Sequence, residues 1–182
     1  MLLFTFLAMA ARHSNYEPLS RWGHAAVAVG SKLHVWRGWT GSARKFKAVA
    51  STVEQFDVTT EQWEQKSVYN TPPPGMGNAA NTVVGTSLYS FGGYDSRSPS
   101  NSLHQLDLRT LEWKDVVVQN PSSGPQKKFG CRMVSYRDNQ LIIFAGSMED
   151  PRCTNEVHVF NLNKGEPSWS QNNDMSYPES LF

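Results

Sequence analysis

Five histidines and two cysteines are the residues of this 182-residue sequence best suited to bind a metal ion or to act as nucleophiles. They are His13, His24, His34, His104, His158, Cys131 and Cys153. Their spacing forms no CxxC or HExxH arrangement, and the sequence has no GxSxG turn or phosphate-binding loop. His104 and His158 hold the same position in successive copies of an internal repeat, and sheets stacked about 10 Å apart would keep them from sharing one metal ion. We therefore predict no enzyme, no metal site and no cofactor.

The charged residues nearly balance, because 17 Lys and Arg face 16 Asp and Glu and leave a formal net charge of +1. A general nucleic-acid binder carries a marked positive excess, so we expect no nucleic-acid partner. No run reaches the roughly 18 apolar residues of a membrane-spanning helix, so we expect no membrane partner either. The chain is long enough to bury a core, and its six Trp residues are suited to fill one.

The first 11 residues are apolar and end in small side chains, like a secretory signal peptide. They lack the basic segment that begins such a peptide, and two cysteines are too few for a disulfide framework. We therefore expect a cytoplasmic protein and leave secretion open as the alternative. The same stretch could also be a strand of a preceding repeat.

The elements that would position any functional side chain come from a pattern of about 50 residues that occurs three times. Glycines at positions 23, 77 and 130 are separated by 54 and 53 residues, and tryptophans at positions 63, 113 and 169 by 50 and 56. In this alignment His24 corresponds to Asn78 and Cys131. Each copy holds four short apolar or alternating runs between Gly, Pro, Asn and Ser clusters, and no helical period is sustained. The pattern predicts an all-β protein of three four-stranded units.

Three features recur in phase within these units. The second run ends in a glycine pair, as in Leu88-Tyr89-Ser90-Phe91-Gly92-Gly93, the third ends in Phe-Asp or Leu-Asp, and a Trp follows six residues later. This combination resembles the kelch-repeat family from about residue 19 to residue 171. The resemblance implies a partial kelch-type β-propeller. Its parts would be a lead-in at 1–18, blades at 19–71, 72–122 and 123–175, and the start of a missing blade at 176–182.

The repeated residues have structural roles in such a blade. Gly92 and Gly93 would end a strand where a sharp turn needs positive φ or a missing Cβ, and Asp57 and Asp107 predict Asx turns before the fourth strand. Arg37 and Ala145 stand where the family places the first glycine of the pair. The predicted structural repeat residues are Gly23, His24, Gly38, Trp63, Gly92, Gly93, Asp107, Trp113, Gly146 and Trp169.

Three blades are too few for a closed ring, because propellers have about four to eight. An open array leaves its first and last sheets with an apolar face and an unpaired edge. We therefore expect a fragment of a longer propeller, a truncated gene model, or one half of a dimeric ring.

Partner binding is predicted on the loops, because loops held by a rigid scaffold carry function. In related kelch domains the basic residue two positions before the first-strand glycine lines a central pocket, and the corresponding positions here are Arg21, Gly75 and Lys128. The loops after the second strands add aromatic and basic residues, among them Arg152, which suit an acidic or C-terminal peptide. The predicted partner-binding residues are Arg21, Trp39, Tyr94, Arg97, Lys128 and Met148.

The fold resemblance leaves several functions open. Arg21-Trp22-Gly23-His24 and the segment from Leu88 to Arg97 look like the kelch-domain substrate receptors of cullin-RING ubiquitin ligases. In that interpretation Lys128 would face the carboxylate of a client. A protein-interaction module without a catalytic role is our leading hypothesis, a ligase substrate receptor is the narrower one, and a secreted propeller oxidase is the alternative from another class.

Overall fold

The computed structural model describes residues 16–41, 47–48, 51–70, 73, 76–148, 152–163 and 167–172. The predictions for residues 1–15, for Gly75 and for the tail at 176–182 concern parts of the chain outside these ranges.

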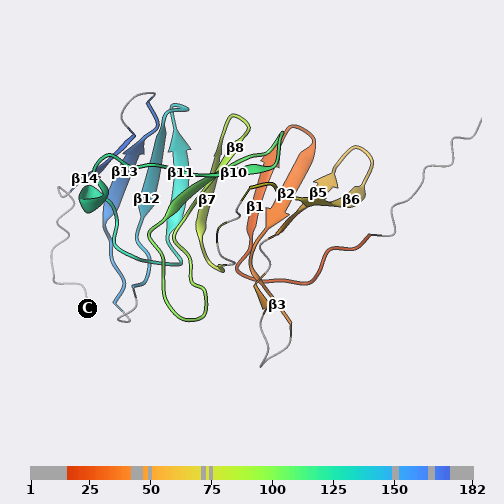
Figure 1. Cartoon of the computed structure of the whole chain (residues 1–182), viewed down its shortest axis with the longest axis horizontal. Coiled ribbons are helices and arrows are strands. Elements are labelled where there is room, and N and C mark those ends of the chain that lie inside the picture. The colour runs from red at the N-terminus through yellow and green to blue at the C-terminus, as the bar shows by residue number, and fades with distance from the viewer. Residues whose placement is uncertain are drawn as a thin grey trace, which may run out of the picture.

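Three four-stranded antiparallel sheets lie side by side (Figure 1). Sheet 1 contains β1 (Ala25–Val29), β2 (Lys32–Trp36), β5 (Thr52–Asp57) and β6 (Gln62–Ser67). Sheet 2 contains β7 (Ala80–Val84), β8 (Ser87–Phe91), β9 (Leu103–Asp107) and β10 (Glu112–Asp115). Sheet 3 contains β11 (Arg132–Tyr136), β12 (Gln140–Phe144), β13 (Val157–Asn161) and β14 (Ser168–Asn172). The predicted all-β fold, a partial propeller of three blades, is confirmed.

Smaller elements join these sheets. A two-stranded hairpin of β3 (Trp39–Thr40) and β4 (Lys47–Ala48) interrupts sheet 1 between its second and third strands and projects from the lower edge in Figure 1. A 3₁₀ turn, η1 (Pro121–Ser123), lies between sheets 2 and 3 in the sequence. The sequence analysis did not predict either element, because two- and three-residue segments carry no periodic signal.

Side-chain hydrogen bonds fix the turns between the third and fourth strands. The Asp107 carboxylate accepts the backbone N–H groups of Arg109 at 2.8 Å and Thr110 at 3.3 Å. The Asp57 carboxylate accepts the backbone N–H of Thr59 at 2.9 Å. These are the predicted Asx turns, and they return the chain to the sheet as its outermost strand.

Left-handed backbone marks the same positions in all three sheets and corrects the sequence alignment. Gly23, Asn78 and Gly130 each precede a first strand with φ of 61°, 55° and 67°. Asn78 donates its N–H to Gly23 O, and Gly130 donates to Asn78 O, both at 2.8 Å. The alignment of Gly77 with Gly23 was therefore wrong by one residue, and His24 corresponds to Ala79 rather than Asn78. Asn tolerates this conformation better than other non-glycine residues, so the second repeat needs no glycine there.

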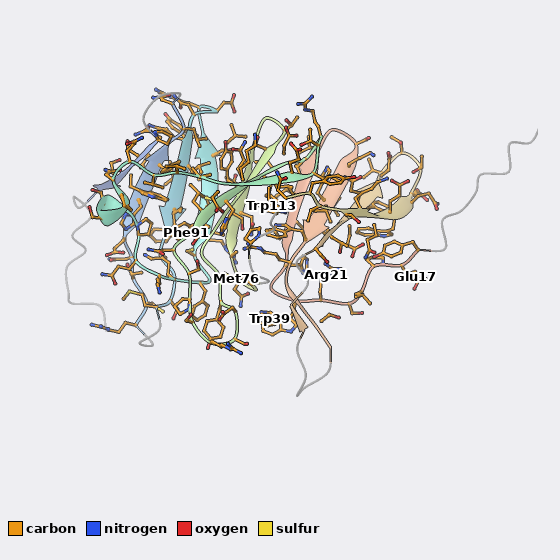
Figure 2. All side chains as sticks on the ribbon, in the orientation of Figure 1. Glu17, Arg21, Trp39, Met76, Phe91 and Trp113 are labelled. Carbon is orange, nitrogen blue, oxygen red and sulfur yellow. The ribbon has the colours of Figure 1, made fainter. Side chains whose placement is uncertain are left out.

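The hydrophobic core lies between the sheets, in two layers that we call joints. The first joint packs Trp36 of sheet 1 against Trp113 of sheet 2, with ring centroids 4.3 Å apart. The second joint packs Phe91 of sheet 2 against Trp169 of sheet 3 at 5.6 Å. Figure 2 labels Trp113 and Phe91, which lie among the sheets rather than at their ends.

Each end of the array carries a face that repeats a joint. Strand register aligns Leu33, Phe56 and Trp63 of sheet 1 with the row of sheet 2 that packs into the first joint. At the other end, Phe144 of sheet 3 corresponds to Trp36 and Phe91, yet it is 45% exposed. The outward faces therefore have the composition of joint surfaces.

Candidate functional site

One end of the sheets collects the residues that follow each second strand, and we call this end the loop face. Each sheet has an isolated backbone bridge at this end. It joins the residue just before Gly23, Asn78 or Gly130 to the residue just after Gly38, Gly93 or Gly146. These bridges pair Trp22 with Trp39, Gly77 with Tyr94, and Phe129 with Ser147. The repeat therefore brings equivalent residues of the three sheets to equivalent places on this face.

Four aromatic side chains, Trp22, Trp39, Tyr94 and Phe129, form what we call the aromatic row. The Trp22 and Trp39 rings have centroids 6.3 Å apart, and those of Tyr94 and Phe129 are 5.3 Å apart. Trp39 lies over Gly77, where an added Cβ would come within 1.8 Å of its indole nitrogen. Trp39 is buried, Tyr94 and Phe129 are half-buried, and Trp22 is 49% exposed. The row presents aromatic surface to solvent on a rigid base.

Arg21 is held by a carboxylate of its own sheet. Its guanidinium donates to Glu54 Oε1 at 2.8 Å, and the two side chains are 4% and 0% exposed. Tyr16 donates its hydroxyl to the other oxygen of Glu54, and Gln65 donates to Tyr16. Burial, followed by the hydrogen bond and charge of Glu54, raises the pKa of Tyr16 to about 12. The charge of Arg21 is therefore already balanced inside sheet 1.

Lys128 has a similar arrangement in the third repeat. Its side chain is 0% exposed, and Nζ donates to Glu156 Oε2 at 3.0 Å. Burial raises the pKa of Glu156, but the hydrogen bonds from Lys128 and His158 and the charge of Lys128 outweigh it, so the pKa lies below its usual value. A client carboxylate would have to compete with Glu156 to reach this lysine.

Arg97 is the exposed cation among the predicted residues. Asp95 Oδ1 accepts the backbone N–H groups of Arg97 and Ser98, both at 2.8 Å, and these bonds hold the pKa of Asp95 below its usual value. The resulting turn fixes the backbone while the Arg97 side chain extends into solvent. Met148 is half-buried on the third loop, where its N–H donates to Arg152 O at 3.2 Å.

The structure brings part of the predicted set together. Gly93 donates to Lys128 O and Lys128 donates to Ser100 O, so the segment before sheet 3 is tied to the loop that carries Tyr94 and Arg97. Figure 2 labels Arg21, Trp39 and Met76 in the lower part of the view, on the side where the β3–β4 hairpin projects in Figure 1. Met76, and not Gly75, holds the repeat position of Arg21 and Lys128, and it is a buried apolar side chain.

Sequence reasoning missed four residues of this site. Trp22 and Phe129 could have been found, because each directly precedes a repeat glycine. Glu54 and Glu156 carried no local signal, because each pairs with a cation 28 or more residues away in the sequence.

Two further observations limit the chemistry of the described residues. Among them, no group of three or more His, Cys, Asp and Glu side chains could hold a metal ion. No helix in the same part of the chain is long and apolar enough to cross a membrane. The described loop face is thus a surface of aromatic rings, one exposed arginine turn and two ion pairs whose cations are buried.

Comparison with known proteins adds a family-level finding. The model of the KLHDC2/KLHL20/DRC7 Kelch-repeats domain matches residues 6–180. The chain is 32% identical over 150 residues to Acyl-CoA-binding domain-containing protein 4 of Arabidopsis thaliana, which covers 82% of this chain and 21% of that protein. It is 28% identical over 137 residues to human Kelch domain-containing protein 2, covering 71% and 33%.

A third relative is the Drosophila melanogaster homolog of Leucine-zipper-like transcriptional regulator 1, which is 27% identical over 157 residues. That match covers 83% of this chain and 15% of the relative. The chain thus spans between 15% and 33% of the length of these three proteins.

Proposed function

Because this chain belongs to the kelch-repeat family, whose domains bind other proteins, we propose that it holds a peptide or loop of a partner on its loop face without catalysing a reaction. The observation that carries this proposal is the aromatic row beside the exposed Arg97. Rigid aromatic rings offer large contact area at little cost in entropy, and an arginine adds charge-assisted hydrogen bonds. This chemistry suits an acidic segment or a C-terminal carboxylate.

The predicted partner-binding residues divide into two roles in this proposal. Tyr94, Arg97 and Met148 reach the surface and make contact with the peptide. Arg21, Trp39 and Lys128 are buried and shape the floor, because their side chains are already engaged with Glu54, Gly77 and Glu156. The Glu54 and Lys128 side chains are fully buried. Leaving a buried charge without its partner is costly, so we expect both ion pairs to survive binding.

A displayed library of peptides, with both free C-termini and internal sequences, tests this proposal. We expect enriched peptides to carry acidic residues or a free carboxylate. Their affinity, measured by fluorescence anisotropy, should fall by about tenfold or more in Tyr94→Ala and Arg97→Ala, the size of a binding hot spot.

Tyr136→Ala and Arg137→Ala are the matched controls. These two residues supply the same side-chain types, with the Arg137 Cζ 4.9 Å from the Tyr136 ring, but they lie at the turn that ends β11, away from the loop face. We expect them to change affinity by less than about twofold. Failure to enrich any peptide, or equal losses in the control variants, would overturn the proposal.

The outward faces of sheets 1 and 3 indicate how the three blades assemble with others. Leu33, Phe56 and Trp63 at one end, and Val134 and Phe144 at the other, repeat surfaces that pack at the joints. We therefore propose that both faces pack against further blades, either those of a second copy or those of a longer chain. Two copies would supply six blades, which is within the range of closed propellers.

A substrate receptor of a cullin-RING ubiquitin ligase is a narrower form of the same proposal. The match to the KLHDC2/KLHL20/DRC7 Kelch-repeats domain is compatible with this role. In that role the same loop face would hold the client. The two free cysteines among the described residues, Cys131 and Cys153, agree with the reducing cytoplasm that we propose as its location.

A further inference from the structure

A cavity of about 410 Å³ opens at the first joint, at the end of the sheets opposite the loop face. Sheet 1 contributes Lys32, His34, Gln55 and Lys66 to its wall, and the turn between β9 and β10 contributes Leu108, Arg109 and Leu111. Its volume is within the usual range of small-molecule sites. The cavity is thus separate from the aromatic row and from the proposed peptide site.

Every titratable side chain that lines the cavity is basic: Lys32, His34, Lys66 and Arg109. Three carboxylates lie near these cations but do not line the cavity. Glu64 is 2.7 Å from Lys66, Asp107 is 3.6 Å from Arg109, and Asp57 pairs with Lys32 in the strand register. All the charge on the cavity surface itself is therefore positive.

His34 adds an oriented donor to this wall. It is buried, and its Nδ1 lies 3.3 Å from the side-chain nitrogen of Gln55. Burial and then the charge of Lys32 lower the pKa of His34, so the ring is neutral near pH 7. If Nδ1 accepts from Gln55, the neutral ring carries its proton on Nε2 and can donate it to an oxygen.

The second joint shows that the scaffold does not require these cations. Strand register places Ser87 at the position of Lys32, Tyr89 at that of His34, and Val116 at that of Lys66. Ser87 accepts a hydrogen bond from Gln105 at 2.8 Å, and Tyr89 is buried. Equivalent positions are therefore neutral and packed at one joint but basic and open at the other.

We propose that the cavity at the first joint binds a small organic phosphate, with the phosphoryl oxygens on Lys32, Lys66, Arg109 and His34 and the organic part against Leu108. A phosphate monoester carries more negative charge at neutral pH than a single carboxylate, and it presents several acceptor oxygens to converging donors. The apolar side of the wall suits a compact ring or chain.

Isothermal titration calorimetry of the whole chain with phenyl phosphate at low salt tests this site. We expect saturable binding that weakens by about fivefold or more in Lys32→Gln and in Arg109→Gln, and further in the double variant. Benzoate has the same ring with one carboxylate, and we expect it to bind at least about tenfold more weakly.

Lys114→Gln is the matched control, because Lys114 is an exposed lysine on β10 that does not line the cavity. It should bind phenyl phosphate within about twofold of the parent chain. Circular dichroism identifies any variant that has lost its fold, and Arg109→Gln is on an exposed turn where we expect the fold to survive. Three results would overturn the proposal: no saturable binding, equal loss in the control, or benzoate binding as tightly as phenyl phosphate.

Discussion

The two joints are built from equivalent positions of the repeat, yet they differ in polarity. At the first joint, Arg37 lies between the sheets with Cζ 3.9 Å above the Trp36 ring, and its Nη1 donates to Ser90 at 3.3 Å. At the second joint, the corresponding residue is Gly92. Both joints keep a large aromatic pair, whereas the residue after the second strand differs between them. Apolar contact therefore defines the joint, and the other positions are available for function.

The first joint also contains polar groups that lack partners within the described part of the chain. The indole nitrogens of Trp36 and Trp113 and the Nε and Nη2 atoms of Arg37 are buried without a hydrogen bond to the described residues. Burial lowers the pKa of Arg37 to about 9. Unpaired buried donors cost free energy, so the first joint is the less favourable of the two in its polar contacts.

The largest expected effect is a difference in stability between replacing a tryptophan at a joint and replacing the equivalent tryptophan at the end of the array. Trp169 is 5% exposed at the second joint, while Trp63 is half-buried on the outward face of sheet 1 beside Phe56. We expect Trp169→Ala to lower the free energy of unfolding by about 3–5 kcal/mol, and Trp63→Ala by less than half of that. Urea denaturation followed by circular dichroism measures both.

Equal losses at the two tryptophans would show that the outward face of sheet 1 is covered in solution, as packing against a second copy would require. Light scattering on a sizing column would then show whether the particle has twice the chain mass of 20.4 kDa. A dimer in which Trp63→Ala also shifts the equilibrium to monomer would place Trp63 at a third joint, made with a second copy.

The intermediate effect concerns the position held by Arg37, Gly92 and Ala145, which have φ of 60°, 67° and 60°. An added Cβ at Gly92 would lie 2.5 Å from the backbone oxygen of Lys128, so both strain and a clash oppose a side chain there. We expect Gly92→Ala to destabilise by about 1–3 kcal/mol in urea denaturation.

Ala145→Gly is the matched control at the same repeat position. Sheet 3 has no described sheet beyond it, and Ala145 is half-buried, so we expect a change of less than about 1 kcal/mol. If Gly92→Ala proved harmless, the tie between Lys128 and the loop after β8 would be softer than the hydrogen bonds of Gly93 and Ser100 indicate.

The repeat could be predicted from sequence because its strongest signals are local. The second glycine of the pair, Asp or Asn at the end of the third strand, and a following Trp recur in phase, and they identified the three sheets. The predicted alignment of the repeats was wrong at Gly77, because Asn78 adopts the left-handed conformation that Gly23 and Gly130 adopt in the other repeats. The ion pairs of Arg21 and Lys128 could not be predicted, because strand pairing brings distant residues together.

The basic cavity was also beyond sequence analysis. Lys32 and His34 lie on β2, Lys66 lies on β6 and Arg109 lies in the turn between β9 and β10, and together they form no motif. Only the stacking of sheet 2 on sheet 1 places them around one space. Sequence patterns in repeat proteins therefore report the scaffold well and the surfaces between repeats poorly.

The smallest expected effect is a pH dependence shared by the two joints. His104 and His158 hold one repeat position and face the first and second joints. Burial lowers the pKa of both. The hydrogen bonds that the two rings make to Asp115 and Glu156 oppose this lowering, and the charges of Arg37 and Lys128 add to it.

Because the folded pKa is below the unfolded value of about 6.5, the unfolded chain binds more protons as the pH falls. We therefore expect the free energy of unfolding to fall between pH 7.5 and pH 5, and to level off once the folded histidines are protonated. His104→Gln and His158→Gln should each reduce this slope, measured by urea denaturation at each pH, and the double variant should reduce it most. Buried His34 would account for a remaining slope, because its pKa is lowered as well. A slope that both variants leave unchanged would show that neither histidine is protonated more readily in the unfolded chain. The pH dependence of stability would then come from other groups.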